Sequence, residues 1–131
     1  MAKSETLPIF LDTYKVVLDI YRATGKLPRE YRYSLGEDMK KDALNLLRLI
    51  FIANHQKNKA ETLSQFLAAL EIVQLQIRLT YDLRAMPIKT MTHINLGLDG
   101  VGRQANAWFR HERSKQLKKQ ESSATEVSPK G

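Results

Sequence analysis

The sequence contains no cysteine. This absence excludes disulfide bonds, thiolate nucleophiles and cysteine-ligated metal sites. The longest uninterrupted apolar runs, such as residues 49–53, hold only a few side chains and are too short to span a bilayer. Residues 1–8 lack the apolar segment of a secretion signal. From these absences we expect a cytoplasmic protein.

Groups suited to catalysis are also scarce. None of the three histidines, His55, His93 and His111, has a carboxylate three residues before it, as the Glu-x-x-His pairs of di-iron bundles require. The carboxylates fall on the predicted polar faces of helices, so no general acid–base pair is indicated. The glycine-rich residues 97–102 lie within a predicted helix, whereas a phosphate-binding glycine loop lies between a strand and a helix. We therefore expect no catalytic residue, no metal site and no cofactor.

Helical periodicity is the main feature that the sequence does contain. A chain of 131 residues is long enough for one domain with its own hydrophobic core. The pattern predicts an all-α, antiparallel up-down-up-down four-helix bundle over residues 1–119 and a disordered tail over residues 120–131. Apolar side chains recur at steps of three and four over residues 7–24, 35–55, 58–86 and 88–119.

Local residues suggest how these helices end and pack. Gly25 is expected to end the first helix in the left-handed conformation. Ser34 and Glu37 have the spacing of a capping box at the start of the second helix. The three glycines within residues 97–102 lower helix propensity, so we expect a neighbouring helix to pack closely against each of them.

The predicted helix over residues 58–86 is apolar on two faces. A first stripe runs from Leu63 to Tyr81 and suits a protein core. The second stripe consists of Ala68, Ile72, Leu75, Leu79 and Leu83. Either this helix lies at the centre of its own bundle, or another copy of the protein covers the second stripe. In so short a chain we favour self-association, with Ile72, Leu75, Leu79 and Leu83 at the oligomer interface.

Basic residues outnumber acidic ones by 21 to 14, which gives a net charge of +7. They gather in a first group, Lys26, Arg29 and Arg32, and in a second group, Arg103, Arg110, Arg113, Lys115, Lys118 and Lys119. We expect both groups at one end of the bundle, merged into a patch where Tyr31, Tyr33 and His111 could stack on unpaired bases. Lysines near a helix C-terminus also complement the helix dipole. The second group exceeds that need, so we favour binding to a polyanion.

Three segments resemble the accessory variability determinant (Avd) proteins of diversity-generating retroelements. Residues 27–37 contain a proline–arginine turn, an aromatic residue and then Leu-Gly-Glu. Residues 77–84 are similar to the family's arginine-bearing third helix. Residues 101–108 contain Val-Gly-Arg followed by a tryptophan. The resemblance covers roughly residues 10–110, and the combination is more specific than any single segment.

The resemblance implies a four-helix protomer in a barrel-like homopentamer with a basic surface. It also implies a non-catalytic accessory protein, encoded by a bacterium or phage, that binds reverse transcriptase, template RNA and cDNA and supports mutagenic reverse transcription (retrohoming). Arg78 matches the family's third-helix arginine, so the resemblance implies that it contacts nucleic acid or the polymerase. Either Asp82 or Arg84 could occupy the family's second arginine position. Bundle proteins encoded within ribosomal RNA intervening sequences are also similar. The alternative function is therefore a structural or protein-binding adaptor of undefined role.

Overall fold

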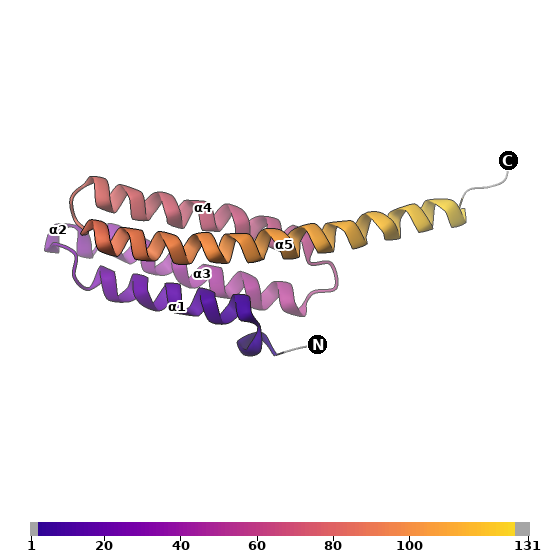
Figure 1. The fold of residues 1–131 in the computed structure, drawn as a ribbon, viewed down its shortest axis with the longest axis horizontal. Helices are drawn as coiled ribbons and strands as arrows, with labels where there is room; N and C mark the ends of the chain where they lie inside the picture. The colour runs from indigo at the N-terminus through magenta and orange to yellow at the C-terminus, as the bar shows by residue number, and fades with distance from the viewer. Residues whose placement is uncertain (1–2, 128–131) are drawn as a thin grey trace.

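The computed structural model describes residues 3–127, and this part of the chain is helical with no strand. Its long helices are α1 (Pro8–Thr24), α3 (Leu35–His55), α4 (Ala60–Asp82) and α5 (Ile88–Val127) (Figure 1). A 3-10 turn, η1 (Ser4–Thr6), precedes α1, and the single-turn helix α2 (Arg29–Arg32) lies between α1 and α3. Consecutive long helices run antiparallel, which confirms the predicted up-down-up-down four-helix bundle.

Each long helix packs against two others. α1 contacts α3 and α5, and α4 contacts the same two helices, so α1 and α4 occupy diagonal corners of the bundle. All four helices contribute fully buried side chains to the core, among them Ile20, Leu46, Phe66 and Leu98. Burial of each such side chain contributes about 1.5–3 kcal/mol to stability, so this shared core holds the four helices together.

The first apolar stripe of α4 faces this core, as predicted. Leu63, Phe66, Val73 and Ile77 have no exposed surface, and Leu70 is almost fully buried. The spacing of these residues places them on one side of a helix. The other sides of α4 do not face this core, so their side chains need not be apolar for the bundle to fold.

Two of the glycines in α5 lie where neighbouring helices approach closely. A Cβ atom on Gly97 would lie 2.6 Å from Val16 Cγ2 of α1, and one on Gly102 would lie 3.2 Å from Leu70 Cδ2 of α4. At Gly100 the nearest such neighbour would be Arg103 Nη2 at 3.7 Å, an ordinary contact distance. The predicted close packing is confirmed at Gly97 and Gly102 and is wrong at Gly100, which contacts neither neighbouring helix so closely.

Two predicted helix ends are wrong in detail. Gly25 has φ −66° and ψ −18°, which is right-handed, because the chain continues through a tight turn in which Lys26 N donates to Ala23 O (3.1 Å). Ser34 makes no side-chain capping hydrogen bond. Its φ of −119° and ψ of −86° differ from the extended backbone of a capping residue, so the predicted capping box with Glu37 does not form.

α5 continues to Val127, past its predicted end near Lys119. Lysine, glutamine and glutamate favour helix, and residues 118–121 consist of these types, so the helix persists where apolar periodicity is lost. Its C-terminal part projects beyond the other helices (Figure 1). The helix is therefore unbroken at residue 120, where the bundle was predicted to end and the tail to begin. The domain boundary stays a prediction, and residues 128–131 of the tail lie outside the described residues.

Candidate nucleic-acid interface

The two basic groups lie at opposite ends of the bundle. We call these the α2 end (residues 25–34 and 83–89) and the α5 end (residues 56–59 and 109–123) (Figure 1). The fourth helix of an up-down-up-down bundle returns to the end where the first helix began. The C-terminal half of α5 therefore meets the α3–α4 connection, and the first basic group stays at the α2 end. The expectation that both groups merge into one patch is wrong for this topological reason.

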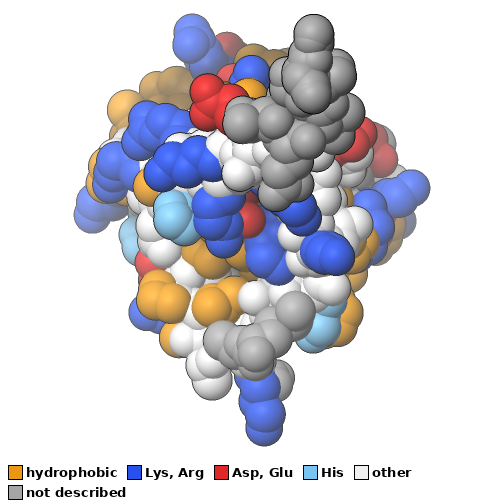
Figure 2. Space-filling view, turned by 90° about the vertical axis from the view of Figure 1, so that its right-hand side faces the viewer, with side chains coloured by type: hydrophobic (Ala, Val, Ile, Leu, Met, Phe, Trp, Pro, Cys, Tyr) orange, Lys and Arg blue, Asp and Glu red, His pale blue; other side chains and the backbone are white. Residues whose placement is uncertain are grey.

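The α5 end brings the second basic group next to the α3–α4 connection. Figure 2 shows Lys and Arg side chains gathered over this end of the molecule. A groove of about 690 Å³ is lined by Gln56, Lys57, Asn58, Lys59, Glu112, Lys115, Gln116, Lys119, Gln120 and Ser123. Lys57 and Lys59 were not among the predicted basic residues, because α5 was expected to meet the connection between α1 and α3. Because helix directions alternate in the predicted bundle, the C-terminal part of the fourth helix could have been placed beside these two lysines from the sequence.

The lysines of this groove have different environments. Lys59 Nζ donates to the carbonyl oxygens of Ala53 (3.0 Å) and Gln56 (2.6 Å), and so caps the C-terminus of α3. Lys115 Nζ lies 3.2 Å from Glu112 Oε2, which offsets part of its charge. Within residues 3–127, Lys57 and Lys119 form no ion pair and are exposed. These two side chains are therefore the most available cations of the groove.

The outer face of α5 extends the basic surface along the helix. Arg103, Arg110 and Arg113 follow one another at spacings of seven and three, which places them on one side of α5. All three side chains are exposed, as is Lys118. At 1.5 Å per residue, the basic residues from Arg103 to Lys119 extend over about 24 Å. The α5 end is thus a long positive surface with an open groove beside it.

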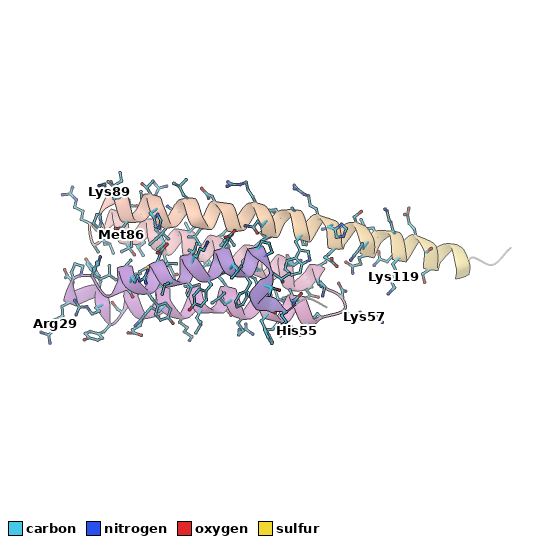
Figure 3. The ribbon with its side chains drawn as sticks, turned by 60° about the horizontal axis from the view of Figure 1, so that its bottom comes forward. Arg29, His55, Lys57, Met86, Lys89 and Lys119 are labelled. Atoms are coloured by element: carbon cyan, nitrogen blue, oxygen red, sulfur yellow. The ribbon has the colours of Figure 1, made fainter. Side chains whose placement is uncertain are left out.

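The first basic group forms a smaller cluster at the α2 end. Arg29 and Lys89 lie at this end, whereas Lys57 and Lys119 lie at the other (Figure 3). Arg32 Nη2 donates to Leu27 O at 3.1 Å, which ties this guanidinium to the α1–α2 connection. The exposed basic residues of this end are Lys26, Arg29, Arg32, Arg84 and Lys89.

The predicted stacking groups are separated in the same way. Tyr31 is half-buried and packs against the core, so its ring is not free to stack on a base. Tyr33 is exposed at the α2 end. His111 is exposed at the α5 end, where it lies next to Arg110 in the sequence. Each end therefore offers one exposed aromatic group from this set.

Arg78, the residue matched to the family's third-helix arginine, lies on α4 near the α2 end. Its side chain is exposed, and its Nε lies 3.6 Å from Asp82 Oδ2. Arg84, the other candidate for the second arginine position, follows α4 with a φ of 60°. The structure therefore separates Arg78 from the basic groove of the α5 end.

The second apolar stripe of α4 is exposed on the protomer surface. Its large side chains keep between 41% and 63% of their surface accessible: Ile72, Leu75, Leu79 and Leu83. α4 is therefore not a central helix of its own bundle, and that alternative is excluded. A contiguous row of exposed apolar side chains is typical of a surface that another protein covers.

Metal-ligand groups and membrane-spanning helices are not found in the part of the chain that the structure describes. Within residues 3–127, no group of three or more His, Asp or Glu side chains is arranged to hold a metal ion. His93 Nε2 lies 2.9 Å from Asp19 Oδ2, and His55 Nδ1 lies 2.9 Å from Phe51 O. None of the helices in the described part of the chain combines the length and apolar character needed to cross a membrane.

Comparison with known proteins identifies the family. No curated protein matches the sequence. The bAvd-like family model matches residues 9–112, from α1 to the middle of α5, and includes all three segments that resemble Avd proteins. Much of the basic α5 end, from Arg113 onward, lies beyond the matched region. The chain belongs to the bAvd-like family of Avd-type accessory variability determinant proteins.

Proposed function

We propose that this protein is the non-catalytic accessory subunit of a diversity-generating retroelement. In this role it binds the element's reverse transcriptase, template RNA and cDNA, and supports mutagenic reverse transcription (retrohoming). Family membership supports an association with the retroelement machinery. The basic surface and groove of the α5 end are the observation that carries the nucleic-acid part of the proposal.

Phosphate contacts dominate the binding that this surface supports. Exposed Lys and Arg side chains release counterions when they neutralise phosphates, which gives affinity without dependence on sequence. Of the predicted stacking groups, His111 is the one that is exposed at the α5 end, so few of these groups could recognise bases there. Such binding suits a protein that must follow a template whose sequence varies.

We further propose a cytoplasmic homopentamer encoded by a bacterium or phage. The exposed apolar stripe of α4 supports self-association, and Arg78, next to this stripe, is proposed to contact the polymerase as the family resemblance implies. Several α5 ends in one assembly would bind one nucleic acid with an avidity above that of a single end.

The test is binding of the whole protein to a fluorescently labelled structured RNA, followed by anisotropy while salt is raised about fourfold. Affinity is expected to fall steeply, because each phosphate contact adds about one unit to the slope of log affinity against log salt. A duplex DNA of equal length tests whether RNA is preferred. An affinity that does not change with salt would refute binding through the basic surface.

A structural adaptor of the ribosomal RNA intervening-sequence type is the alternative function. The exposed apolar stripe of α4 favours it, because such a stripe binds protein and not nucleic acid. Capture of reverse transcriptase by the tagged protein from nuclease-treated extract distinguishes the two functions. Loss of capture after nuclease treatment would indicate a bridge of nucleic acid, and an adaptor without nucleic-acid affinity would fail the RNA titration.

A further inference from the structure

The groove of the α5 end contains one acidic side chain among its basic ones. Glu112 lines it together with Lys57, Lys59, Lys115 and Lys119. Only 10% of the Glu112 side chain is exposed, compared with 59% of the Lys115 side chain that it contacts. A carboxylate in this position repels phosphate groups, so a groove that bound phosphates alone would bind them better without it. The ligand of this groove should therefore offer a hydrogen-bond donor as well as negative charge.

The ion pair with Lys115 leaves part of this carboxylate unused. The two residues are three apart on α5, and Lys115 Nζ lies 3.2 Å from Glu112 Oε2. A pair of this kind with an exposed lysine contributes little to stability. Within residues 3–127, the Glu112 carboxylate makes no other hydrogen bond or ion pair. Its second oxygen, Oε1, is therefore available to accept a hydrogen bond from a ligand.

Lys59 holds the opposite wall of the groove in place. Its Nζ donates to three carbonyl oxygens at the end of α3, those of Ala53 (3.0 Å), Asn54 (3.1 Å) and Gln56 (2.6 Å). An ammonium group has three donors, so these bonds use all of them. They fix the α3–α4 connection and so position its exposed residue Lys57 on this wall. Lys59 is thus a positioning residue, and Lys57 is the cation that a ligand can reach.

The rest of the groove is lined by uncharged polar side chains. They are Gln56 and Asn58 on the wall of the connection, and Gln116, Gln120 and Ser123 on the wall of α5. Thr62 Oγ1 donates to Gln56 Oε1, so the amide group of Gln56 keeps its donor end for a ligand. None of the described residues that line the groove is aromatic, so it has no ring on which a base could stack. Such a lining suits the sugar and phosphate groups of a nucleic acid.

RNA supplies both of the groups that these walls require. Its phosphates carry negative charge, and each ribose carries a 2′-hydroxyl that donates a hydrogen bond and is absent from DNA. Carboxylates also accept a hydrogen bond from a ribose hydroxyl in dinucleotide-binding folds. Lys115 and Lys119 lie one helical turn apart, about 6 Å along α5, so a single strand can contact both. Lysines beside a carboxylate therefore match a chain of alternating phosphate and ribose.

We propose that this groove binds the ribose–phosphate backbone of RNA, with Glu112 accepting a hydrogen bond from a 2′-hydroxyl and Lys57 and Lys119 contacting phosphates on either side. The inference rests on the proposed RNA binding and specifies how the α5 end distinguishes RNA from DNA. The contact involves no base, so it tolerates a template of any sequence. In a hybrid of template RNA and cDNA, the groove holds the RNA strand.

The wall formed by α5 lies almost entirely beyond the match to the bAvd-like family model. The match ends at residue 112, whereas Lys115, Gln116 and Lys119 follow it. Membership of the family therefore does not account for this wall. The selection of RNA is a property that we assign to this chain from its own residues.

The test compares labelled hairpins of one sequence made of natural RNA, of RNA with 2′-fluoro in place of each 2′-hydroxyl, and of DNA. The 2′-fluoro RNA keeps the A-form shape but lacks the hydroxyl donor, so it separates the hydroxyl from the shape of the duplex. Affinities of the whole protein are measured by anisotropy at one salt concentration. The unmodified protein is expected to bind natural RNA about tenfold more tightly than 2′-fluoro RNA, because a hydrogen bond to a charged acceptor is lost.

Variants of Glu112 and a matched control locate this preference. Glu112→Ala removes the acceptor and its repulsion, so 2′-fluoro RNA and DNA should bind more tightly and the preference should disappear. Glu112→Gln keeps the size of the side chain and a neutral acceptor, and a preference of about threefold is expected, because a neutral acceptor forms a weaker hydrogen bond. Glu61→Ala removes one exposed acidic residue at the same end of the bundle, outside the groove. This control should keep the preference of about tenfold.

Lys57→Ala tests the phosphate contact from the wall of the connection. It is expected to weaken the binding of all three hairpins by the same factor, about threefold to tenfold, since each of them carries phosphates. Lys26→Ala removes the same charge at the α2 end and should change each affinity by less than about twofold. Equal losses for these two variants would place the bound strand outside the groove.

The outcomes separate this inference from the proposed RNA binding. Equal binding of natural and 2′-fluoro RNA by the unmodified protein would overturn the ribose contact and leave salt-dependent RNA binding in place. A preference that persists undiminished in both Glu112 variants would also overturn it. A protein without RNA affinity, or with an affinity that does not respond to salt, would overturn both proposals. Circular dichroism checks that each variant is folded.

Discussion

α4 and α5 are neighbours in the bundle, but they present different chemistry to the outside. The exposed side of α4 carries an apolar row, bordered by Glu71 and by the ion pair of Arg78 with Asp82. The exposed side of α5 carries arginine and lysine from Arg103 to Lys119. The comparison indicates that the proposed self-association and the proposed polyanion binding would use separate helices. Each property should therefore be removable by substitutions that leave the other in place.

The largest expected effect tests this separation from the α4 side. Leu79→Glu places a charge in the apolar row, and the protein is expected to become a folded monomer of 15.0 kDa by light scattering at low and high salt. The α5 end is unchanged in each protomer, so the monomer should still bind RNA, with lower affinity because avidity is lost. A monomer with no RNA affinity would show that the two functions share one surface.

The next effect tests the separation from the α5 side. Combined Arg110→Ala, Arg113→Ala and Lys118→Ala substitutions remove three exposed charges from the α5 end. RNA affinity is expected to fall about 100-fold near 0.1 M salt. The slope of log affinity against log salt should fall by about 2–3 units, because each lost phosphate contact removes about one unit. The oligomer mass should stay the same. These changes are measured by anisotropy and light scattering on the same preparations.

A charge-matched triple variant at the other end is the control. Lys26→Ala, Arg29→Ala and Lys89→Ala remove the same net charge from the α2 end. A loss of affinity of less than about tenfold is expected, since only the long-range attraction changes. Equal losses for the two triple variants would mean that net charge, and not the α5 end, governs binding.

The glycines of α5 give a smaller effect and a matched pair. Gly97→Ala puts a Cβ 2.6 Å from Val16 Cγ2, and overpacking of this kind destabilises by about 1–3 kcal/mol. Gly100→Ala meets only Arg103 Nη2 at 3.7 Å, so the gain in helix propensity of about 0.5–1 kcal/mol should stabilise the protein. Urea unfolding in the Leu79→Glu background avoids contributions from dissociation. Equal shifts for the two variants would contradict the close approach of α1 at Gly97.

The sequence predicted the bundle well because apolar spacing reports which side of a helix is buried. It predicted α3 from Leu35 to His55, the start of α5 at Ile88, and both stripes of α4. It did not predict the extent of α5, because the helix continues on backbone propensity after packing contacts end. It also did not predict that large apolar side chains of α1, such as Leu11, Tyr14 and Leu18, would be exposed.

The candidate site was predicted less well than the fold. Spacing along one helix located the basic residues of α5, but placing them beside Lys57 required following the direction of each helix through the bundle. Local turn chemistry was equally incomplete. Gly25 was expected in the left-handed conformation and is right-handed, whereas Arg84 is left-handed. Turn conformation depends on the helix that follows as well as on the residue type.

The smallest expected effect concerns Arg84, which follows the C-terminal end of α4. Ala85 N donates to Thr80 O (3.0 Å) and Arg84 N donates to Tyr81 O (2.8 Å), a Schellman motif that places Arg84 at φ 60°. A side chain in this conformation costs about 1 kcal/mol, which glycine avoids. Arg84→Gly should therefore stabilise the monomeric background by about 0.5–1 kcal/mol in urea unfolding. An arginine in this strained conformation motivates a test of whether its charge has a function. Weaker capture of reverse transcriptase by Arg84→Gly, with unchanged capture by Lys26→Ala, would assign Arg84 to the polymerase contact, and equal capture by both would leave that contact to Arg78.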